Sequence, residues 1–578
     1  MHYKKLVKKY KKLCKKRRRS SWRKYKETRQ SIPEMVQLSN IIQKKRKNKI
    51  NTFIKPDGSS SEPGRETLDI LIKTHFPKAT EKIVKKYTSV NCHTRQFIMS
   101  KNANWISTDL VREAMQCFEK KKSPGPDDIK PVIFEHLPTN VLNHLVFLYR
   151  SVILLRYTPL RWKGTRVIFI PKPGKPNYNI PKAFRPISLS NYFLKTLERL
   201  VCWKIEEDLK QRPLHKSQHG FTKNKSTESA ASNVVSFVEK HIYNKQHCVG
   251  VFLDISSAFD SIKPEFIREE LHKKTDNADL VEWYYGYLKH RDMEFDLQGE
   301  HMKISNSMGF PQGGVASAKL WILAFNEAME IINSDGIYGV GFADDCCALV
   351  GGTNLGYMIQ KLQTMLDKLI KWGKTAGLEF NEEKTVVIHF TRTKTKPKHY
   401  LSMNGKKVPY SQDCKYLGLR FDSKLNWNGH IEEKINKCKR FLMKTVNKTR
   451  SNFGPKPSLM KWGYTGLVRP VLTYGAMIWG HSALLKTNIE KLRKLNRLAA
   501  NTITAVRRSN PTRALEIIYE LMPLHILIQQ TGMNSFIRLQ EHIDKIPTYL
   551  KTKQFNKNSH VSKWLNSAKN MNIDFKNW

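Results

Sequence analysis

The sequence has few acidic residues for its length. Its 578 residues include 50 Asp and Glu against 101 Lys and Arg, which gives a formal net charge of +51. This deficit of negative charge excludes an acidic housekeeping enzyme, and it says more about partners than about fold. The partners that it favours are polyanions, either the phosphate backbone of a nucleic acid or an anionic membrane surface.

The sequence also lacks a long hydrophobic run. No segment approaches the ~18 consecutive apolar residues that a membrane-spanning helix needs. The apolar segment 141–157 is interrupted by Asn143, His144, Arg150 and Arg156. The basic N-terminus is not followed by the apolar core and cleavage site of a secretory signal. These absences favour a nucleic acid over a membrane as the partner.

Paired cysteines are missing as well. The nine cysteines are scattered, only Cys346 and Cys347 are close together, and no C-x-x-C pair occurs. This pattern supports neither a disulfide framework nor a zinc ribbon. We therefore expect a reduced, soluble, intracellular protein. The basic run Lys15–Arg19 favours the nucleus as its location, with the cytoplasm as the alternative.

Apolar material is sufficient for folded cores. Hydrophobic residues make up 40% of the chain and aromatic residues 10%, so the chain is not a disordered polycation. Its length predicts about 3 to 5 domains. The first 30 residues hold 15 Lys or Arg and one acid, Glu27, along a thin apolar stripe at helical spacing. This pattern predicts a helical arm that contacts nucleic acid, with a passive solvated tail as the alternative.

Three aspartates stand at the ends of predicted buried strands. Asp254 closes the apolar run 249–255, and Asp344 and Asp345 lie between two short apolar runs, as in a strand–turn–strand. Charges in such places cost desolvation energy unless they are paired or bind a cation. If the strand ends meet, the carboxylates could hold two divalent ions, the arrangement that nucleotidyl transfer uses. The alternative is an ordinary acidic hairpin turn.

Two further segments accompany the aspartates. The sequence PQGG at 311–314 predicts a turn whose glycines allow close backbone approach to a flat ligand. Upstream, Lys172, Lys175 and Arg185 lie in a proline-rich, hairpin-like region and could grip a triphosphate. Taken singly, the first segment is better explained as an ordinary turn and the second as a solvated basic loop.

The order of the motifs resembles that of a reverse transcriptase of the non-LTR (LINE-type) retrotransposons, and of the jockey-like group in particular. Between about 105 and 530 the chain carries, in order, KKKSPGPDDI, IPKPGK, FRPISL, QHGFTKNKST, VFLDISSAFD, GFPQGG, FADD, GLEFNEEKT and KYLGLRFD. Nine motifs in one order make a chance resemblance implausible. The segments 464–480 and 514–525, which are predicted to be helical, are also similar to the segment that follows the polymerase core in that group.

The resemblance implies an α+β right-hand polymerase with fingers, palm and thumb. The basic helical arm would cover 1–54, and a linker with the N-terminal extension of the fingers would cover 55–140. The reverse transcriptase domain, with fingers and palm, would span 153–421. A helical thumb and post-polymerase region would follow at 422–545, and a C-terminal tail at 546–578.

The resemblance also assigns roles to single residues. Asp254 and Asp344 would bridge two Mg²⁺ ions, with Mn²⁺ as an alternative, and Asp345 would be a less central third ligand. Lys384 would protonate the leaving pyrophosphate. The remaining positions would bind the incoming nucleotide (Lys172, Arg185, Phe259, Gln312 and Gly313) or position the primer end (Tyr416, Leu417 and Gly418).

The resemblance implies RNA-directed DNA polymerisation, with an RNA template, a DNA primer and deoxynucleoside triphosphates as partners. The chain departs from the family pattern at Thr222 and Asn224, at Gly314, and at 316–318. Neither an endonuclease before residue 100 nor a ribonuclease H start after 540 is expected, which suggests a truncated copy or a fragmentary gene. The alternative function is therefore a non-catalytic, RNA-binding relic of such an element.

Overall fold

A computed structural model describes residues 52–81, 103–392, 399–449, 457–504 and 510–540, together with Arg17, Ser20, Ile50, Lys563 and Trp564. Most of the predicted arm 1–54 and of the predicted tail 546–578 lies outside these residues. The described part mixes helices and strands, in agreement with the predicted α+β class. Within it, no helix is long and apolar enough to cross a membrane.

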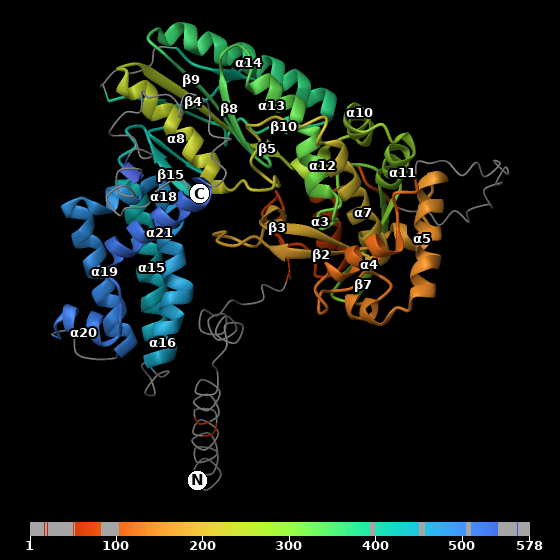
Figure 1. Cartoon of the computed structure of the whole chain (residues 1–578), viewed down its shortest axis with the longest axis horizontal. Coiled ribbons are helices and arrows are strands. Elements are labelled where there is room, and N and C mark those ends of the chain that lie inside the picture. The colour runs from red at the N-terminus through yellow and green to blue at the C-terminus, as the bar shows by residue number, and fades with distance from the viewer. Residues whose placement is uncertain are drawn as a thin grey trace.

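A four-stranded antiparallel sheet forms the centre of the molecule (Figure 1). Its strands, in spatial order, are β11 (Val386–Phe390), β4 (His247–Leu253), β9 (Asp345–Gly352) and β8 (Tyr338–Phe342). Strand β4 is apolar along almost its whole length, because successive residues face opposite sides of the sheet and both sides are covered. Cys248 and Phe252 pack with the helix on one side, whereas Val249 and Val251 belong to the core on the other.

Two long helices cover the two faces of this sheet. Helix α8 (Thr227–Tyr243) begins with a capping box at Ser226 and buries Val234, Val235 and Val238. Helix α14 (Leu355–Ala376), with α13 (Asn326–Ile332) beside it, belongs to the opposite core. In the sequence, the spacing of Leu355, Ile359, Leu362, Leu366 and Leu369 predicts a helix over about 355–372 with these residues on one face. The structure confirms this helix, and the last four of these residues are buried. It ends at Gly377, whose φ of 83° is suited to a C-terminal glycine.

A second, five-stranded sheet lies on the N-terminal side. Its strands, in spatial order, are β1 (Thr80–Glu81), β7 (Glu300–Asn306), β6 (Arg291–Leu297), β2 (Gly164–Pro171) and β3 (Phe184–Ser190). The β2–β3 pair is the predicted hairpin-like basic region. The surrounding helices are α3 (Arg65–His75), α4 (Thr108–Gln116), α5 (Thr139–Leu154), α7 (Tyr192–Asp208), α10 (Pro264–Lys274), α11 (Ala278–Lys289) and α12 (Ser317–Ala324). The sequence offers Ser107 or Thr108 as the cap of α4, and in the structure Ser107 is the cap, its side chain accepting from Leu110 N.

The C-terminal part is helical after two small hairpins, β12–β13 (Ser402–Met403 and Lys406–Lys407) and β14–β15 (Asp413–Tyr416 and Leu419–Asp422). Its main helices are α15 (Asn428–Thr449), α16 (Pro457–Gly463), α17 (Arg469–Thr473), α18 (Ala476–Trp479), α19 (Lys486–Thr504), α20 (Thr512–Ile518) and α21 (Leu524–Gln540). In Figure 1 these blue helices lie on one side of the molecule and the five-stranded sheet on the other, with the four-stranded sheet joining them.

Candidate active site

The three aspartates meet at one end of the four-stranded sheet. The last paired residues of β4 and β9 are Leu253 and Cys346, so Asp254 and Asp345 follow at the same end. Asp344 lies in the two-residue turn between β8 and β9, because Phe342 pairs with Asp345. The predicted strand–turn–strand is therefore confirmed, and the strand register delivers all three carboxylates to one place.

Electrostatics confirm that the carboxylates are neighbours. Burial by the surrounding protein, together with the charges of Asp344 and Asp254, raises the pKa of Asp345 to about 6. Burial and the charge of Asp254 also raise the pKa of Asp344, while its own backbone amide and Arg185 oppose the shift. Both side chains are nevertheless open to solvent. An exposed group of mutually repelling carboxylates is a chemical match for a divalent cation.

The donor set fits a partial metal site rather than a closed cage. No three His, Cys, Asp or Glu side chains of the described residues enclose an ion on their own. The nearest cation to Asp254 is Lys384, whose Nζ lies 3.0 Å from Asp254 Oδ2. Mg²⁺ is commonly held by one or two carboxylates plus substrate phosphates. Asp254 and Asp344 fit that requirement once a nucleotide supplies the other oxygens.

Cations face the aspartates from the β2–β3 hairpin. Arg185 pairs with Ile170 across the hairpin, and Lys172 directly follows β2. Lys172 is anchored there, since its backbone amide donates to Ala183 O at 2.8 Å and its Nζ donates to Lys182 O at 2.9 Å. Burial lowers the pKa of Lys172, as do the nearby charges of Arg185, Lys175 and Lys384. The hairpin thus gathers positive charge close to the carboxylates, where a triphosphate would be neutralised.

The PQG turn is held against β3. The amide of Gly314 donates to Pro311 O at 2.9 Å, which closes the predicted turn, and Ser188 N donates to Gln312 O at 2.7 Å. Gly313 has a φ of 123°, and a Cβ there would lie 2.6 Å from Ser188 O, so this approach requires glycine. The side-chain oxygen of Gln312 is buried and has no hydrogen-bond partner among the described residues.

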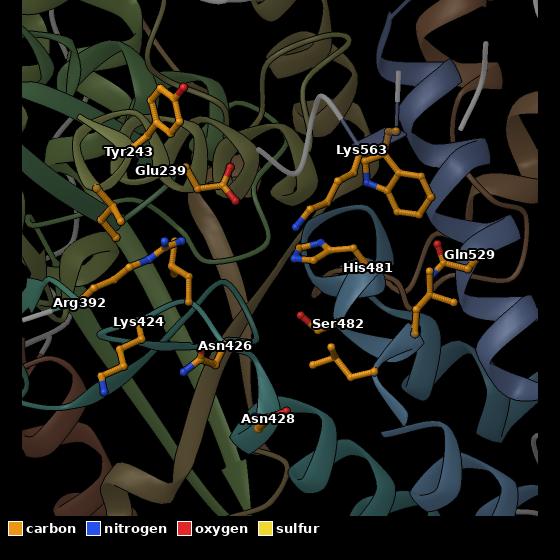
Figure 2. A pocket seen from close by; sticks show the side chains of 15 residues that line it. Glu239, Tyr243, Arg392, Lys424, Asn426, Asn428, His481, Ser482, Gln529 and Lys563 are labelled. Atoms are coloured by element: carbon orange, nitrogen blue, oxygen red, sulfur yellow. The ribbon is translucent and has the colours of Figure 1, made fainter. Parts of the chain in front are cut away.

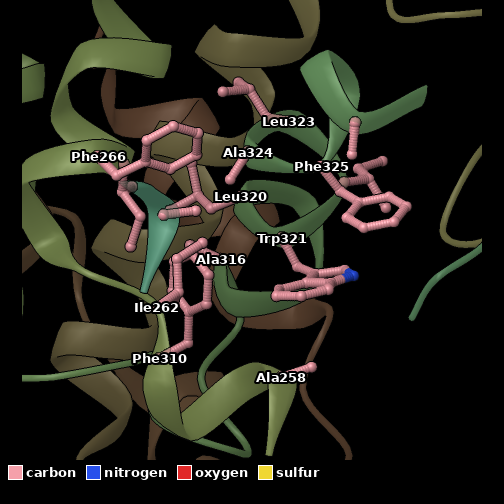
Figure 3. Close-up of a cluster of buried hydrophobic side chains, with 14 of the residues drawn as sticks. Ala258, Ile262, Phe266, Phe310, Ala316, Leu320, Trp321, Leu323, Ala324 and Phe325 are labelled. Carbon is pink, nitrogen blue, oxygen red and sulfur yellow. The ribbon is translucent and has the colours of Figure 1, made fainter. Parts of the chain in front are cut away.

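Phe259 lies half-buried at the edge of a core cluster. Its ring stacks on Trp321 with a centroid distance of 5.3 Å, and it meets Phe310 edge-on at 6.2 Å. Figure 3 shows part of this cluster, in which Trp321 and Phe310 lie among the side chains of α12 and of the segment 258–266. Phe259 therefore has core contacts on one side and an exposed part on the other.

The segment Tyr416–Gly418 is the turn of the β14–β15 hairpin. Leu417 and Gly418 have φ values of 50° and 75°, as a tight two-residue hairpin turn requires. Tyr416 Oη donates to Val340 O of β8 at 3.3 Å, and Tyr474 Oη donates to Leu417 O at 2.9 Å. These bonds fix the turn beside the strand that leads to Asp344.

The sequence analysis assigned no role to Gln218, whose side chain bonds to the β8–β9 turn that carries Asp344. Gln218 is 2% exposed, and its Oε1 accepts from Gly220 N at 3.0 Å and from Ala343 N at 3.3 Å. Segment 217–219 also bonds to both sides of Gly341, so it extends the sheet beyond β8. Ala343 has a φ of 57°, a conformation that costs a non-glycine residue energy. The Gln218 bond helps to hold that conformation next to Asp344.

We expect Gln218→Met to lower the kcat of primer extension by about tenfold or more, because it would displace Asp344, to which the resemblance assigns a catalytic role, and small displacements of such groups are costly. Stability should fall by roughly 1–3 kcal/mol, since the Ala343 amide loses its acceptor. Thr196→Val is the control: it deletes a buried hydroxyl that bonds to Tyr192 O within α7. Steady-state kinetics and thermal unfolding check both. A drop in kcat no larger for Gln218→Met than for the control, at equal stability loss, would assign Gln218 a structural role only.

A buried charged cluster behind the PQG turn was also missed. Arg291 is fully buried and donates to Leu288 O and Gly309 O, and it interacts electrostatically with Asp260 and Glu198. Glu198 Oε2 accepts from Val315 N at 3.0 Å. Burial raises the pKa of Glu198 to about 7 and that of Asp260 to about 7. The sequence analysis assigned no role to these three charged residues, although Asp260 ends the motif VFLDISSAFD, because they come from three segments far apart in the chain.

Glu198 makes folding stability depend on pH. Its pKa is raised from an ordinary value of 4.5 to about 7 in the folded chain, so the folded chain retains a proton that the unfolded chain releases between these values. Its contribution to the free energy of unfolding therefore falls as pH rises through this window, by about 3 kcal/mol. The free energy of unfolding of Glu198→Gln, taken relative to that of wild type, should therefore be about 3 kcal/mol higher at pH 8 than at pH 4.5. Urea unfolding of both proteins at pH 4.5 and pH 8 checks this expectation. The same stability difference between variant and wild type at the two pH values would contradict it.

Comparison with known proteins places this site in a class. Residues 170–421 match the family model described as reverse transcriptase (RNA-dependent DNA polymerase). This segment contains all three aspartates, the β2–β3 cations, the PQG turn and the β14–β15 hairpin. The resemblance to reverse transcriptases that the motif order indicated is confirmed.

Particular relatives come from non-LTR elements of insects. RNA-directed DNA polymerase from mobile element jockey of Drosophila melanogaster is 26% identical over 470 residues, covering 79% of this chain and 50% of the relative. Probable RNA-directed DNA polymerase from transposon BS of the same species is 26% identical over 447 residues, covering 75% and 48%. The chain thus spans about half the length of these curated relatives. Among solved structures, apo telomerase from Candida tropicalis is similar with a TM-score of 0.34 at 12% identity, covering 50% of this chain and 59% of that chain.

Proposed function

We propose that this chain is an RNA-directed DNA polymerase that extends a DNA 3′ end on an RNA template. The observation that carries the proposal is the meeting of Asp254, Asp344 and Asp345 opposite the cations of the β2–β3 hairpin. Carboxylates for a divalent ion facing basic groups for a triphosphate form the minimal equipment of nucleotidyl transfer. The names of the relatives support RNA as the template.

The proposed reaction is an in-line displacement. The primer 3′-hydroxyl gives up its proton to solvent as its oxygen attacks the α-phosphorus of the nucleotide. The bond to the bridging oxygen breaks, and pyrophosphate leaves with a proton from Lys384. Arg185 and Lys172 hold the phosphates, with Arg185 able to make bidentate contacts. Asp254 and Asp344 would hold Mg²⁺, with Asp345 beside them, and the ion would supply charge stabilisation at the reacting phosphate.

Other residues position the substrates in this proposal. Phe259 lies under the sugar of the incoming nucleotide, and Gln312 and Gly313 lie near the templating pair. The turn Tyr416–Gly418 holds the primer end.

We assign the four-stranded sheet to a palm, the β2–β3 hairpin to fingers, and the helices after 422 to a thumb. The domain limits proposed from the sequence are kept: 1–54, 55–140, 153–421, 422–545 and 546–578.

Primer extension by the purified full chain tests the function. The substrate is oligo(dT) annealed to poly(rA), with dTTP and Mg²⁺, and reactions with a chelator serve as the blank. Extension that requires the metal supports the proposal. RNA binding without any extension, under conditions in which the chain is folded, would instead support the non-catalytic relic.

A further inference from the structure

A pocket with both polar and apolar lining lies at the far end of the four-stranded sheet from the aspartates. Its volume is about 780 Å³, and it is lined by the end of α8, the residue after β11, the β15–α15 loop, the turn after α18, and α21. Arg392 follows β11, whose last residue pairs with Cys248 near the start of β4. Asp254 is six residues further along that strand, which at ~3.3 Å per residue places it about 20 Å away.

Positive side chains converge on this pocket. Figure 2 shows the guanidinium of Arg392 facing His481 and Lys563 across it, with the carboxylate of Glu239 at one edge. Among the described residues, no carboxylate lies within ion-pair distance of Arg392 or of Lys424, the other lysine of the lining. The pocket therefore carries three basic side chains and His481 against one acid, a balance suited to an anion.

Hydrogen bonds and close packing fix the side of the pocket that carries Lys563. The neighbouring Trp564 is 2% exposed, donates from Nε1 to Met477 O at 2.7 Å, and packs where Gly480 and Gly532 leave room. Gln529 Nε2 donates to Gly480 O at 2.6 Å on the same wall. Lys563 is thus held at the pocket by an anchored neighbour.

The pocket also offers apolar and aromatic surface. Tyr243 is 59% exposed, and Leu484 and Leu485 are each about half exposed. An exposed ring beside convergent cations is the combination that binds single-stranded nucleic acid, where bases stack and phosphates pair with basic groups. The volume falls in the range of ligand pockets and suits one or two nucleotides rather than a duplex.

We propose that this pocket binds one or two nucleotides of single-stranded RNA, outside the polymerase site. The inference depends on the proposed function only in taking RNA as the ligand. The pocket would give the chain a second RNA-binding site, about 20 Å from Asp254 at the strand rise given above.

Charge reversal at Arg392 tests the proposal. The full chain is titrated against a fluorescent 20-nucleotide single-stranded RNA over a series of NaCl concentrations. Arg392→Glu should weaken binding by at least about fivefold and flatten the log–log salt slope by about 0.7 for the lost phosphate contact. Lys371→Glu is the matched control, since Lys371 is exposed on α14, on the opposite face of the sheet. Equal effects of the two reversals would overturn the proposal.

Two further measurements identify the ligand. Tyr243→Ala should weaken the same RNA by at least about fivefold through lost stacking, with an unchanged melting temperature. Competition by free AMP or GMP at millimolar concentration should leave RNA binding intact. Displacement by the free nucleotides would make the pocket a mononucleotide site and contradict RNA as its ligand.

Extension separates this proposal from the polymerase function. On a hairpin primer–template whose single-stranded overhang is too short to reach the pocket, Arg392→Glu should extend at the wild-type rate. If wild type and variant both fail to extend, the polymerase function fails while the RNA titration still decides the pocket.

Discussion

Asp344→Ala should reduce primer extension by at least about 100-fold and leave primer–template affinity nearly unchanged. The turn between β8 and β9 places Asp344 beside Asp254, and metal-assisted charge stabilisation contributes several kcal/mol, at about 1.36 kcal/mol per tenfold in rate. Affinity for nucleic acid comes mainly from cationic contacts to phosphates, which this substitution spares. Single-turnover extension and a binding titration measure the two quantities.

Asp367→Ala is the matched control for this substitution. Asp367 is exposed on α14 and bonds only to Gln363 among the described residues. Its substitution by alanine therefore removes one negative charge, as Asp344→Ala does, but at a distance from the site. We expect the control to extend primers at the wild-type rate. Near-wild-type extension by Asp344→Ala would show that the site is assigned wrongly, whereas equal loss in both variants would point to a general charge effect.

Phe259→Val should lower the preference for deoxynucleotides over ribonucleotides by about tenfold or more in kcat/KM. The half-buried ring stacks on Trp321 and leaves part of its surface exposed. If that surface lies under the sugar, it fills the space that a 2′-hydroxyl needs. Trimming it should admit ribonucleotides while extension by deoxynucleotides is largely kept.

The core contacts of Phe259 supply the competing explanation. A residue that only fills space should cost about 1–4 kcal/mol when trimmed and should lower both activities together. Phe325→Val is the control, because Phe325 is 1% exposed and stacks on the same Trp321 at 5.6 Å. Both variants should melt earlier, but only Phe259→Val should change the sugar ratio. An unchanged ratio would contradict the proposed role of Phe259 in excluding ribonucleotides, and it would weaken the assignment of Asp254.

Local pattern determined much of this fold. Continuous apolar runs predicted β4 and the β8–β9 hairpin, because a strand covered on both faces must be apolar throughout. Three- and four-residue spacing predicted α14 because only one face of that helix is buried. The turn at 311–314 followed from proline and glycine. These features depend on neighbours in the chain, which the sequence displays directly.

Antiparallel register decided what the sequence could only suggest about the site. The pairing of Leu253 with Cys346 brings Asp254 to Asp344 across about 90 residues of chain, and the β2–β3 hairpin brings Arg185 to the same place. Family resemblance named these residues, but it gave no reason why they should meet. The reason is that strand pairing places residues by register, independently of their separation in sequence.

By itself, the amino-acid sequence determined the basic character of the chain, its α+β elements and the identity of the carboxylates, since these depend on composition and local spacing. Only the tertiary structure revealed Gln218 beneath the aspartate turn, the buried Glu198 and Arg291, and the pocket around Arg392. Each of these joins side chains from elements far apart in the chain. Burial and proximity of that kind arise from packing, and no local pattern encodes them.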